Sequence, residues 1–264
     1  MSSRDGIAWA ANMKHSLWPA IIGLVLGSSG RAVAQGEITL ISPASIRPAL
    51  EQILTGFERK TGDKVKVTFG NGGRNRQQVA SGEAVFDVSI LQPPYPEVLA
   101  SGNVVTSSAT PFASIPIGVA VKQGAAKPDL STPEAVKRML LSAKSITYPA
   151  AAGGAAAGVS IEATFKQLGI ADEMQPKVRT GAGAIGLVAT GDVELYLTFL
   201  SEMTAPGIDL VGPLPPEIST PTALVGFVST HAKNPAAAQD LLNYLSSSDA
   251  AEVYKAHWML PNSR

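Results

Sequence analysis

Residues 65–91 read VKVTFGNGGRNRQQVASGEAVFDVSIL, and this stretch decides which fold the chain is expected to adopt. Apolar and polar residues alternate over 64–69 with the period of a strand, and the glycine-rich turn 70–73 separates this strand from a helical segment over 74–81. A glycine then ends the helix, and residues 86–91 supply a second, apolar strand. A strand, a helix and a strand in this order predict one unit of a mostly parallel sheet, in which ligands bind at the carboxyl ends of the strands.

The strand-to-helix turn recurs elsewhere in the chain. The first strand, 37–41, leads through the turn 42–45 into a helix, for which Ser45 is the expected N-cap. An Ala- and Gly-rich run over 149–158 and the glycines of 181–186 each separate a later strand from a helix. The other expected strands are 115–121, 145–148, 177–179, 193–199, 209–211 and 223–229, and the other expected helices are 97–100, 133–142 (capped by Thr132 or Ser131), 235–246 and 249–257.

Two of these strands are expected to connect two lobes. The strand over 115–121 would leave the first lobe and the strand over 223–229 would return to it. Lobe 1 would then comprise 35–114 and 224–264, and lobe 2 would comprise 115–223. The predicted fold class is therefore α/β, with two lobes, each a mostly parallel sheet flanked by helices, joined by crossing hinge strands.

The N-terminus has the features of an export signal. A Lys-His pair precedes the apolar run 17–26, which at about ten residues is too short to span a membrane. Residues 32–34, Ala-Val-Ala, form a small-x-small cleavage site that would leave Gln35 as the first residue of the mature chain. Residues 1–34 are therefore interpreted as a cleaved signal peptide with an N-terminal extension, and the expected location is the periplasm.

Two alternatives stay open at this end of the chain. A short membrane anchor is the other interpretation of the apolar run, although no Cys follows it for lipid attachment. The natural start is either Met1 or Met13, because the first twelve residues precede the signal without belonging to it.

Composition and charge restrict the class of protein. The 264 residues are 45% hydrophobic and 16% charged, so the chain has enough apolar material for a sizeable core. Of 21 basic and 21 acidic residues, the first 34 positions hold three and one, so the mature chain keeps 18 and 20. A chain so close to neutral is not expected to bind nucleic acid or an anionic membrane. The absence of Cys excludes disulfides, thiolate zinc sites and cysteine nucleophiles.

The four turns predict a site for a small anion. A helix N-terminus offers free N–H groups and a partial positive charge, and turns from both halves would direct several such ends into one cleft. Arginines lie in the first turns of the first two helices, where a cation is mildly unfavourable unless it binds a carboxylate or phosphate. The candidates so placed are Ser42, Ser45, Arg47, Asn71, Gly72, Gly73, Arg74 and Arg76 from the first half, and Tyr148, Gly153, Gly154, Ser160, Glu194, Thr198 and Ser201 from the second.

Each of these features also has a purely structural interpretation. Glycine turns serve to reverse the chain, and Arg47, Arg74 and Arg76 could point to solvent and pair with Glu51 or Glu83. The run 181–186 matches GxGxxG, but its strand is short and no acidic residue follows at the spacing of a dinucleotide site. No histidine pair has metal-ligand spacing and no histidine neighbours a serine nucleophile, so neither a metal nor a cofactor is expected.

Five stretches of the mature chain form a recognisable series: LISPASIRPAL, FERKTGDKVKVTFGNGG, VASGEAVFDVSI, the run 149–158 and LVGPLPPEI. Together they resemble the molybdate-binding-protein-like group of periplasmic solute-binding proteins, and the similarity spans nearly the whole mature chain. The resemblance implies a two-lobed, type II periplasmic-binding-protein fold with crossing hinge strands. It further implies a monomer that closes on a small anion and delivers it to the permease of an ABC transporter.

The resemblance also implies where the anion binds. In molybdate binders, amides and serine hydroxyls of the first two turns hold the oxyanion, and the second lobe contributes a tyrosine. Here Ser42 and Ser45 match the first turn, whereas Asn71, Gly72 and Gly73 replace serines in the second and Phe199 aligns with the tyrosine. These departures, with three arginines nearby, favour a carboxylate over molybdate.

An enzyme on the same fold is the alternative function. Aconitate isomerase is a periplasmic enzyme that resembles these binding proteins, and its tricarboxylate substrate would suit a cleft with arginines. Moving an allylic proton requires a base, for which Glu194 or Tyr148 is the candidate. A pure binding protein has no catalytic residue, so chemical turnover distinguishes the two functions.

Overall fold

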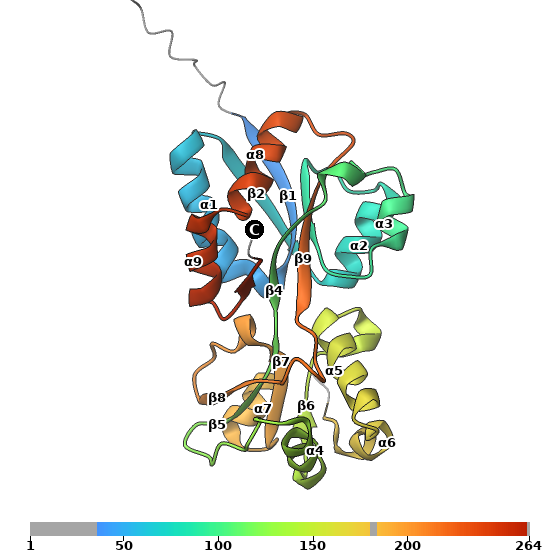
Figure 1. Ribbon diagram of the computed structural model, residues 1–264, viewed down its shortest axis with the longest axis vertical. Helices are drawn as coiled ribbons and strands as arrows, with labels where there is room; N and C mark the ends of the chain where they lie inside the picture. The colour runs from blue at the N-terminus through green and yellow to red at the C-terminus, as the bar shows by residue number, and fades with distance from the viewer. Residues whose placement is uncertain (1–35, 180–183, 263–264) are drawn as a thin grey trace, which may run out of the picture. The chain divides into compact units, whose positions relative to one another are not determined.

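The computed structural model describes residues 36–179 and 184–262, which belong to one compact unit, Ala34–Arg264 (Figure 1). The predicted signal peptide and the glycine turn at 181–183 lie outside the described residues. Within the described part, the elements form two separate sheets with helices packed on them.

The larger sheet has six strands in the order β10-β4-β9-β3-β1-β2. The strands β1, β2 and β3 are parallel to one another, and β9 is antiparallel to both β3 and β4. The strands are β1 (Glu37–Pro43), β2 (Lys64–Gly70), β3 (Val88–Leu91), β4 (Thr110–Ile115), β9 (Thr222–Val228) and β10 (Leu260–Pro261). The helices that accompany this sheet are α1 (Arg47–Thr61), α2 (Gly72–Ser81), α3 (Pro96–Ala100), α8 (Pro235–Leu245) and α9 (Ser248–Ala256), with the 3-10 turns η1 (Ala44–Ile46) and η2 (Thr106–Ser108).

The smaller sheet has four strands in the order β6-β7-β5-β8. They are β5 (Ile117–Lys122), β6 (Ile146–Thr147), β7 (Leu195–Phe199) and β8 (Ile208–Pro213). Its helices are α4 (Pro133–Ser142), α5 (Ala156–Gln167), α6 (Ala171–Met174) and α7 (Ala184–Thr190), with the 3-10 turns η3 (Ala151–Gly153), η4 (Gln175–Lys177) and η5 (Leu200–Glu202). The six-stranded and four-stranded sheets, each with its helices, are the two lobes expected of the fold.

The prediction that each sheet is mostly parallel was wrong. Two of the five strand pairs in the larger sheet and one of the three in the smaller sheet are parallel. The crossing strands explain this, because β4 runs towards the smaller sheet and β9 runs back (Figure 1). A returning strand placed between β3 and β4 must be antiparallel to both of its neighbours.

A proline divides the predicted crossing strand. The pattern over 115–121 predicted one strand, but β4 ends at Ile115 and β5 begins at Ile117, with Pro116 between them. Proline has no N–H for a strand ladder, so a change of partner sheet at this residue costs no further hydrogen bond. The lone bridge between Ile146 and Val178 replaces the short strand predicted over 177–179.

The helix starts follow from local hydrogen bonding. Thr132 caps α4 as expected, its hydroxyl accepting from the N–H of Ala135 at 3.1 Å. Ser45 was wrongly predicted to cap the first helix, because the 3-10 turn η1 intervenes and α1 begins at Arg47 without a side-chain cap. Asn71 caps α2 instead, and its Oδ1 accepts from the N–H of Arg74 at 2.8 Å.

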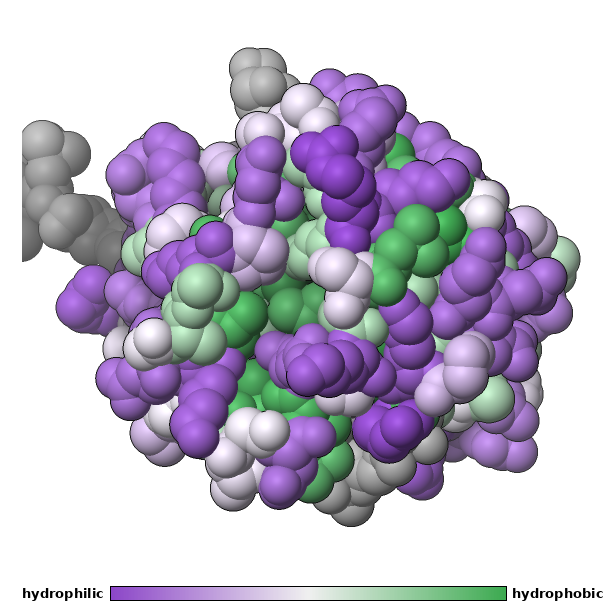
Figure 2. Space-filling view, turned by 90° about the horizontal axis from the view of Figure 1, so that it is seen from below, coloured by the Kyte–Doolittle hydropathy of each residue, from purple (hydrophilic) through white to green (hydrophobic). Residues whose placement is uncertain are grey.

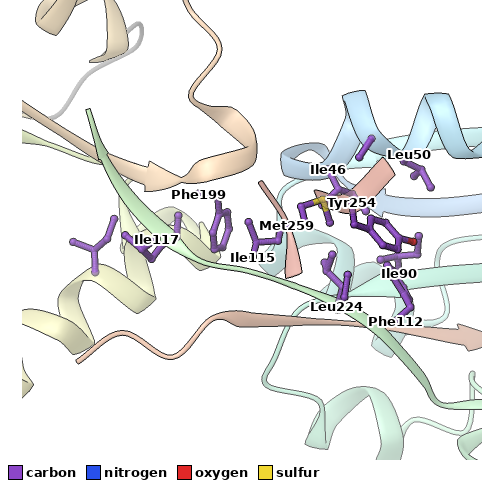
Figure 3. Packing of buried hydrophobic residues seen from close by; sticks show 14 of the residues in the cluster. Ile46, Leu50, Ile90, Phe112, Ile115, Ile117, Phe199, Leu224, Tyr254 and Met259 are labelled. Carbon is purple, nitrogen blue, oxygen red and sulfur yellow. The ribbon is translucent and has the colours of Figure 1, made fainter. Parts of the chain in front are cut away.

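One hydrophobic cluster extends through both lobes. Figure 3 shows Phe112 and Tyr254 at the larger sheet and Ile115, Ile117 and Phe199 where β4 passes into β5. All five side chains are buried, Ile115 and Ile117 to 0% and 1% exposure. The crossing between the sheets is therefore packed as core.

The face of the protein seen from the side of the smaller lobe carries mainly hydrophilic side chains (Figure 2). Figure 2, seen from below, shows polar side chains around a recessed area of hydrophobic ones.

In the part of the chain that the structure describes, no helix combines the length and the hydropathy needed to cross a membrane.

Candidate functional site

A small pocket lies where the strands of both lobes end. Its volume is about 120 Å³, well below the roughly 300–1,000 Å³ of clefts for drug-sized ligands. The carboxyl ends of β1, β2, β3 and β7 all lead into it, as expected for a sheet in which ligands bind at strand ends. The lining residues are Pro43, Ala44, Ser45, Gly70, Asn71, Gly72, Gln92, Pro149, Ala155, Ala156, Ala157, Phe199 and Glu202.

Two helices begin at the pocket, one from each lobe. The first N–H groups of an α-helix have no partner within the helix, and the helix dipole makes this end partly positive. In α2 the N–H of Gly73 bonds to the carbonyl of Gly154 and the N–H of Arg74 to Asn71, which leaves that of Gly72 at the pocket. Ala156 and Ala157 start α5 on the opposite side. The pocket thus offers backbone donors from both lobes to an anion.

Side-chain groups complete the lining. The Oγ of Ser45 and the amide nitrogen of Gln92 lie 3.5 Å apart, so the hydrogen bond between them is weak. Both side chains are buried, and each can donate to a ligand. None of the lining residues is Lys, Arg or His, so the positive potential comes from helix ends and neutral donors.

Glu202 is the ionisable residue of the lining. It follows β7 in the turn η5, and the hydroxyl of Thr198 donates to its Oε2 at 2.7 Å. Burial raises the pKa of Glu202, and the hydrogen bond from Thr198 offsets only part of this effect. Glu202 in turn contributes, after burial, to raising the pKa of Tyr196. The pocket therefore contains a carboxyl group that binds its proton more tightly than an exposed glutamate.

Direct hydrogen bonds join the two lobes around the pocket. The N–H of Gly73 donates to the carbonyl of Gly154 at 3.0 Å, and the Nδ2 of Asn71 donates to the carbonyl of Gly153 at 2.9 Å. On the other side, the hydroxyl of Ser201 donates to the carbonyl of Ser45 at 2.8 Å. These contacts hold the starts of α2 and α5 close together over the pocket.

Three of the predicted ligand residues, Ser45, Asn71 and Gly72, line this pocket. Gly73, Gly153 and Gly154 contribute instead to the contacts between the lobes. Ser42 is fully buried, with its hydroxyl on the carbonyl of Pro43, and Thr198 is also fully buried and supports Glu202. Sequence patterns located three turns that line this pocket, because the turns are set locally, but not which residues of each turn face the pocket.

The arginines lie outside the pocket lining. Arg47 stacks on Phe69, with its guanidinium carbon 3.9 Å from the ring centroid, and pairs with Glu51 at 3.6 Å. Arg76 donates to the carbonyls of Gln92 and Pro93, at 3.2 and 3.1 Å. Arg74 is exposed. Arg47 thus pairs with Glu51, as in the purely structural interpretation. Arg76 stabilises the turn after β3 through its hydrogen bonds.

The two candidate bases, Tyr148 and Glu194, also lie elsewhere. Tyr148 contacts a separate pocket with Glu162 and Phe165, and burial followed by the charge of Glu162 raises its pKa. The carboxylate of Glu194 accepts from the backbone N–H of Lys144 at 2.9 Å and precedes β7, at the end opposite to Glu202. The whole length of β7 therefore separates Glu194 from the pocket, which lies at the carboxyl end of this strand.

Sequence reasoning missed Gln92 and Glu202 as pocket residues. Gln92 directly follows β3 and Glu202 ends the turn η5 after β7, at the carboxyl ends that were expected to bind a ligand. Applying that rule to every polar residue after a strand would have identified both. Among the described residues there is no cluster of three or more acidic or histidine side chains that could hold a metal.

The two sheets, the crossing strands and the pocket at the strand ends are those of a two-lobed ligand-binding protein. The chain belongs to the bacterial extracellular solute-binding protein family, whose model matches residues 38–260. Within that family it belongs to the molybdate-binding-protein-like group, which confirms the resemblance noted in the sequence.

Three relatives illustrate the range of this group. Aconitate isomerase of Pseudomonas sp. is 29% identical over 252 residues, covering 92% of this chain and 95% of the relative. The molybdate-binding protein ModA of Azotobacter vinelandii is 30% identical over 254 residues, covering 93% and 98%. The substrate-binding domain of a molybdenum ABC transporter from Clostridium difficile superposes with a TM-score of 0.72 at 16% identity, covering 87% of this chain and all of that one.

Proposed function

We propose that this protein is a solute-binding protein that captures one small anion in the pocket between its lobes. The observation that carries this proposal is the convergence of the α2 and α5 N-termini, from different lobes, on one pocket lined by neutral donors. An anion there would contact both helices at once. It would be held by backbone N–H groups, Ser45 and Gln92 without a counter-charged side chain.

Capture would proceed by closure of the lobes. The bonds from Gly73 to Gly154 and from Asn71 to Gly153 belong to the closed arrangement. An anion that touches both helix N-termini makes all of its contacts only in that arrangement, so its binding shifts the population towards it. The strands that cross at Pro116 and before β9 would act as the hinge.

The proposed setting is the periplasm. The family is that of bacterial extracellular proteins, and the N-terminal 34 residues have the pattern of a cleaved export signal. By analogy with the molybdenum transporter relative, the partner of the loaded protein would be the permease of an ABC transporter, and the protein would act as a monomer. Residues 35–114 with 224–264 and residues 115–223 would be the two moving lobes.

The test is thermal unfolding of the mature chain, from Gln35, with molybdate, tungstate, sulfate, phosphate, citrate and the two aconitate isomers. A ligand present at about 100 times its Kd adds about 2.7 kcal/mol, which corresponds to a Tm increase of roughly 5–10 °C for a protein of this size. A shift with at least one anion and none with neutral sugars supports the proposal. Equal Tm values with and without every anion would reject it.

An isomerase acting on a small carboxylate is the second candidate. The specific observation in its favour is Glu202, a carboxyl group in the pocket with a raised pKa, which has the properties of a general base for an allylic proton. The 29% identity to aconitate isomerase adds support. Under this alternative Glu202 takes the role first assigned to Glu194 or Tyr148.

Turnover decides between the two candidates. Purified protein is incubated with cis-aconitate and, separately, with trans-aconitate, and proton NMR measures conversion to the other isomer. Conversion by the wild type that Glu202→Gln abolishes would establish the isomerase, whereas tight binding without conversion leaves the binding protein as the function.

A further inference from the structure

A carboxyl group is an unusual neighbour for a bound anion. The carboxyl of Glu202 lines the same small pocket as the N-termini of α2 and α5. In its ionised form it would repel any anion held by those N-termini across a short distance and in partly desolvated surroundings. Two negative groups in such a pocket are tolerated when one proton lies between them, because the repulsion then becomes a hydrogen bond.

Among the described residues, those that line the pocket with Glu202 include no positive side chain that could pair with it. The turn η1 packs against η5 and has no ionisable side chain, and β5 contributes Lys122, whose ammonium donates to the carbonyl of Thr190 at 3.0 Å. The adjacent strand β7 contributes Tyr196, which is a donor but not a cation. Of the two arginines closest to the pocket residues, Arg47 stacks on Phe69 and pairs with Glu51. Arg76 keeps its charge at the edge of the pocket, where it donates to the carbonyls of Gln92 and Pro93 and not to Glu202.

One carboxyl oxygen of Glu202 already accepts a hydrogen bond from the hydroxyl of Thr198. This hydroxyl donates to Oε2 at 2.7 Å, and among the described residues no bond to Oε1 was found. That free oxygen can either accept a proton from a ligand or carry a proton and donate it. Thr198 is fully buried and so fixes the carboxyl in place.

We propose that Glu202 couples anion capture to one proton, so that the pocket binds a fully ionised anion only together with a proton and binds a proton-bearing anion without one. In both cases the bound state holds a single proton between Oε1 of Glu202 and one oxygen of the ligand. A proton from solvent is taken up in the first case, and none is exchanged in the second. The favoured ligand class in neutral or alkaline solution is therefore an anion that keeps a proton, such as hydrogen phosphate.

This inference rests on the proposed function, because it concerns the same pocket. Sulfate serves as the fully ionised probe and inorganic phosphate as the proton-bearing one, since from about pH 8 to about pH 9 phosphate is present almost entirely as hydrogen phosphate, which keeps one proton. Above the pKa of Glu202, the affinity for sulfate falls about tenfold per pH unit, as linkage to one proton requires. The affinity for phosphate stays flat over the same range.

Calorimetry provides two readouts. The Kd of each anion is measured across this pH range, and at one alkaline pH the binding heat is measured in buffers of different ionisation enthalpy. Sulfate binding is expected to take up about one proton and phosphate binding about none. This measurement uses the wild-type protein and does not depend on the folding of any variant.

Substitution identifies the residue. In Glu202→Gln, a neutral amide of the same size can donate to the anion, so the pH dependence for sulfate disappears and sulfate binds at least about tenfold more tightly at alkaline pH. Glu217→Gln is the matched control, because Glu217 is exposed and lies outside the pocket lining. The control keeps the pH dependence of the wild type.

The outcomes separate the two proposals. If neither anion binds at any pH, nor any other small anion, the proposed function fails. If sulfate binds with the same Kd across the pH range, or Glu202→Gln keeps the wild-type pH dependence, the coupling to Glu202 is refuted while the binding function stands.

Discussion

Gly73 is the residue at which a single methyl group is expected to block closure of the lobes. A Cβ at this position would lie 2.9 Å from the Cα and 3.0 Å from the carbonyl oxygen of Gly154, in the other lobe. Both contacts are with backbone, which cannot rotate away as a side chain can. The Gly73→Ala variant must therefore separate the two loops and weaken the 3.0 Å hydrogen bond between them.

The size of the effect follows from these contacts. Overpacking by one methyl group costs about 1–3 kcal/mol, and a lost hydrogen bond costs about 1 kcal/mol. We take about 2 kcal/mol as the penalty on the closed arrangement, which corresponds to a roughly 30-fold higher Kd for the anion. The free energy of unfolding of the ligand-free protein is expected to stay constant or rise by up to about 1 kcal/mol, because alanine favours the helix α2 more than glycine does.

Gly153→Ala is the matched control for this prediction. Its Cβ would meet no atom within 4 Å, although Gly153 lies next to Gly154 in the same loop. Calorimetry measures the Kd for the anion found by the thermal screen, and urea unfolding measures stability without ligand. Equal Kd values for the two variants, or a loss of stability without a loss of affinity in Gly73→Ala, would refute the assignment of this contact to closure.

Three further predictions concern Asn71, Arg74 and Asp87. Asn71→Ala removes the cap of α2 and lowers the free energy of unfolding, measured with urea, by about 1 kcal/mol. Asn71→Asp keeps the cap but loses the bond to the carbonyl of Gly153, so it weakens anion binding without lowering stability. Arg74→Ala leaves the Kd for citrate within about twofold, because Arg74 is exposed and outside the pocket lining; a selective loss of citrate binding would restore the carboxylate role predicted for it. Burial disfavours ionisation of Asp87, but hydrogen bonds from Thr39 and the N–H of Lys233 outweigh burial and lower its pKa. The ionised Asp87 therefore stabilises the fold above about pH 4, and this stabilisation is lost as the pH falls through the lowered pKa. Asp87→Asn is expected to lower the free energy of unfolding by about 2 kcal/mol at neutral pH and to remove this part of its pH dependence. An unchanged dependence of unfolding on acid pH would contradict the role of Asp87.

Local patterns predicted the units of the fold well. The helix over 133–142 matches α4 to the residue, and a strand and a helix flank the predicted turn, although α2 begins at Gly72 and not at residue 74. Both depend on nearest neighbours in the chain, through alternation, capping and glycine. Errors arose where a distant strand intervened, as when β9 entered between β3 and β4 and made the larger sheet mixed.

The same division applies to the site. The glycine- and serine-bearing turns, the lack of Cys and the resemblance to anion-binding proteins were all present in the chain itself, and they led to Ser45, Asn71 and Gly72. The sequence alone therefore determined which kind of turn lines the pocket, because a turn is set by its own few residues.

Only the tertiary structure decided which side chains meet in the pocket. Ser201 reaches the carbonyl of Ser45 across 156 positions of the chain, and that approach brings Glu202 to the pocket while Arg47 is held on Phe69. Contacts between residues so far apart in the chain depend on how the two lobes pack at their crossing strands, and no local sequence pattern encodes that packing. The charge of the site therefore became visible only in the folded protein, because the residue that carries it comes from the far lobe.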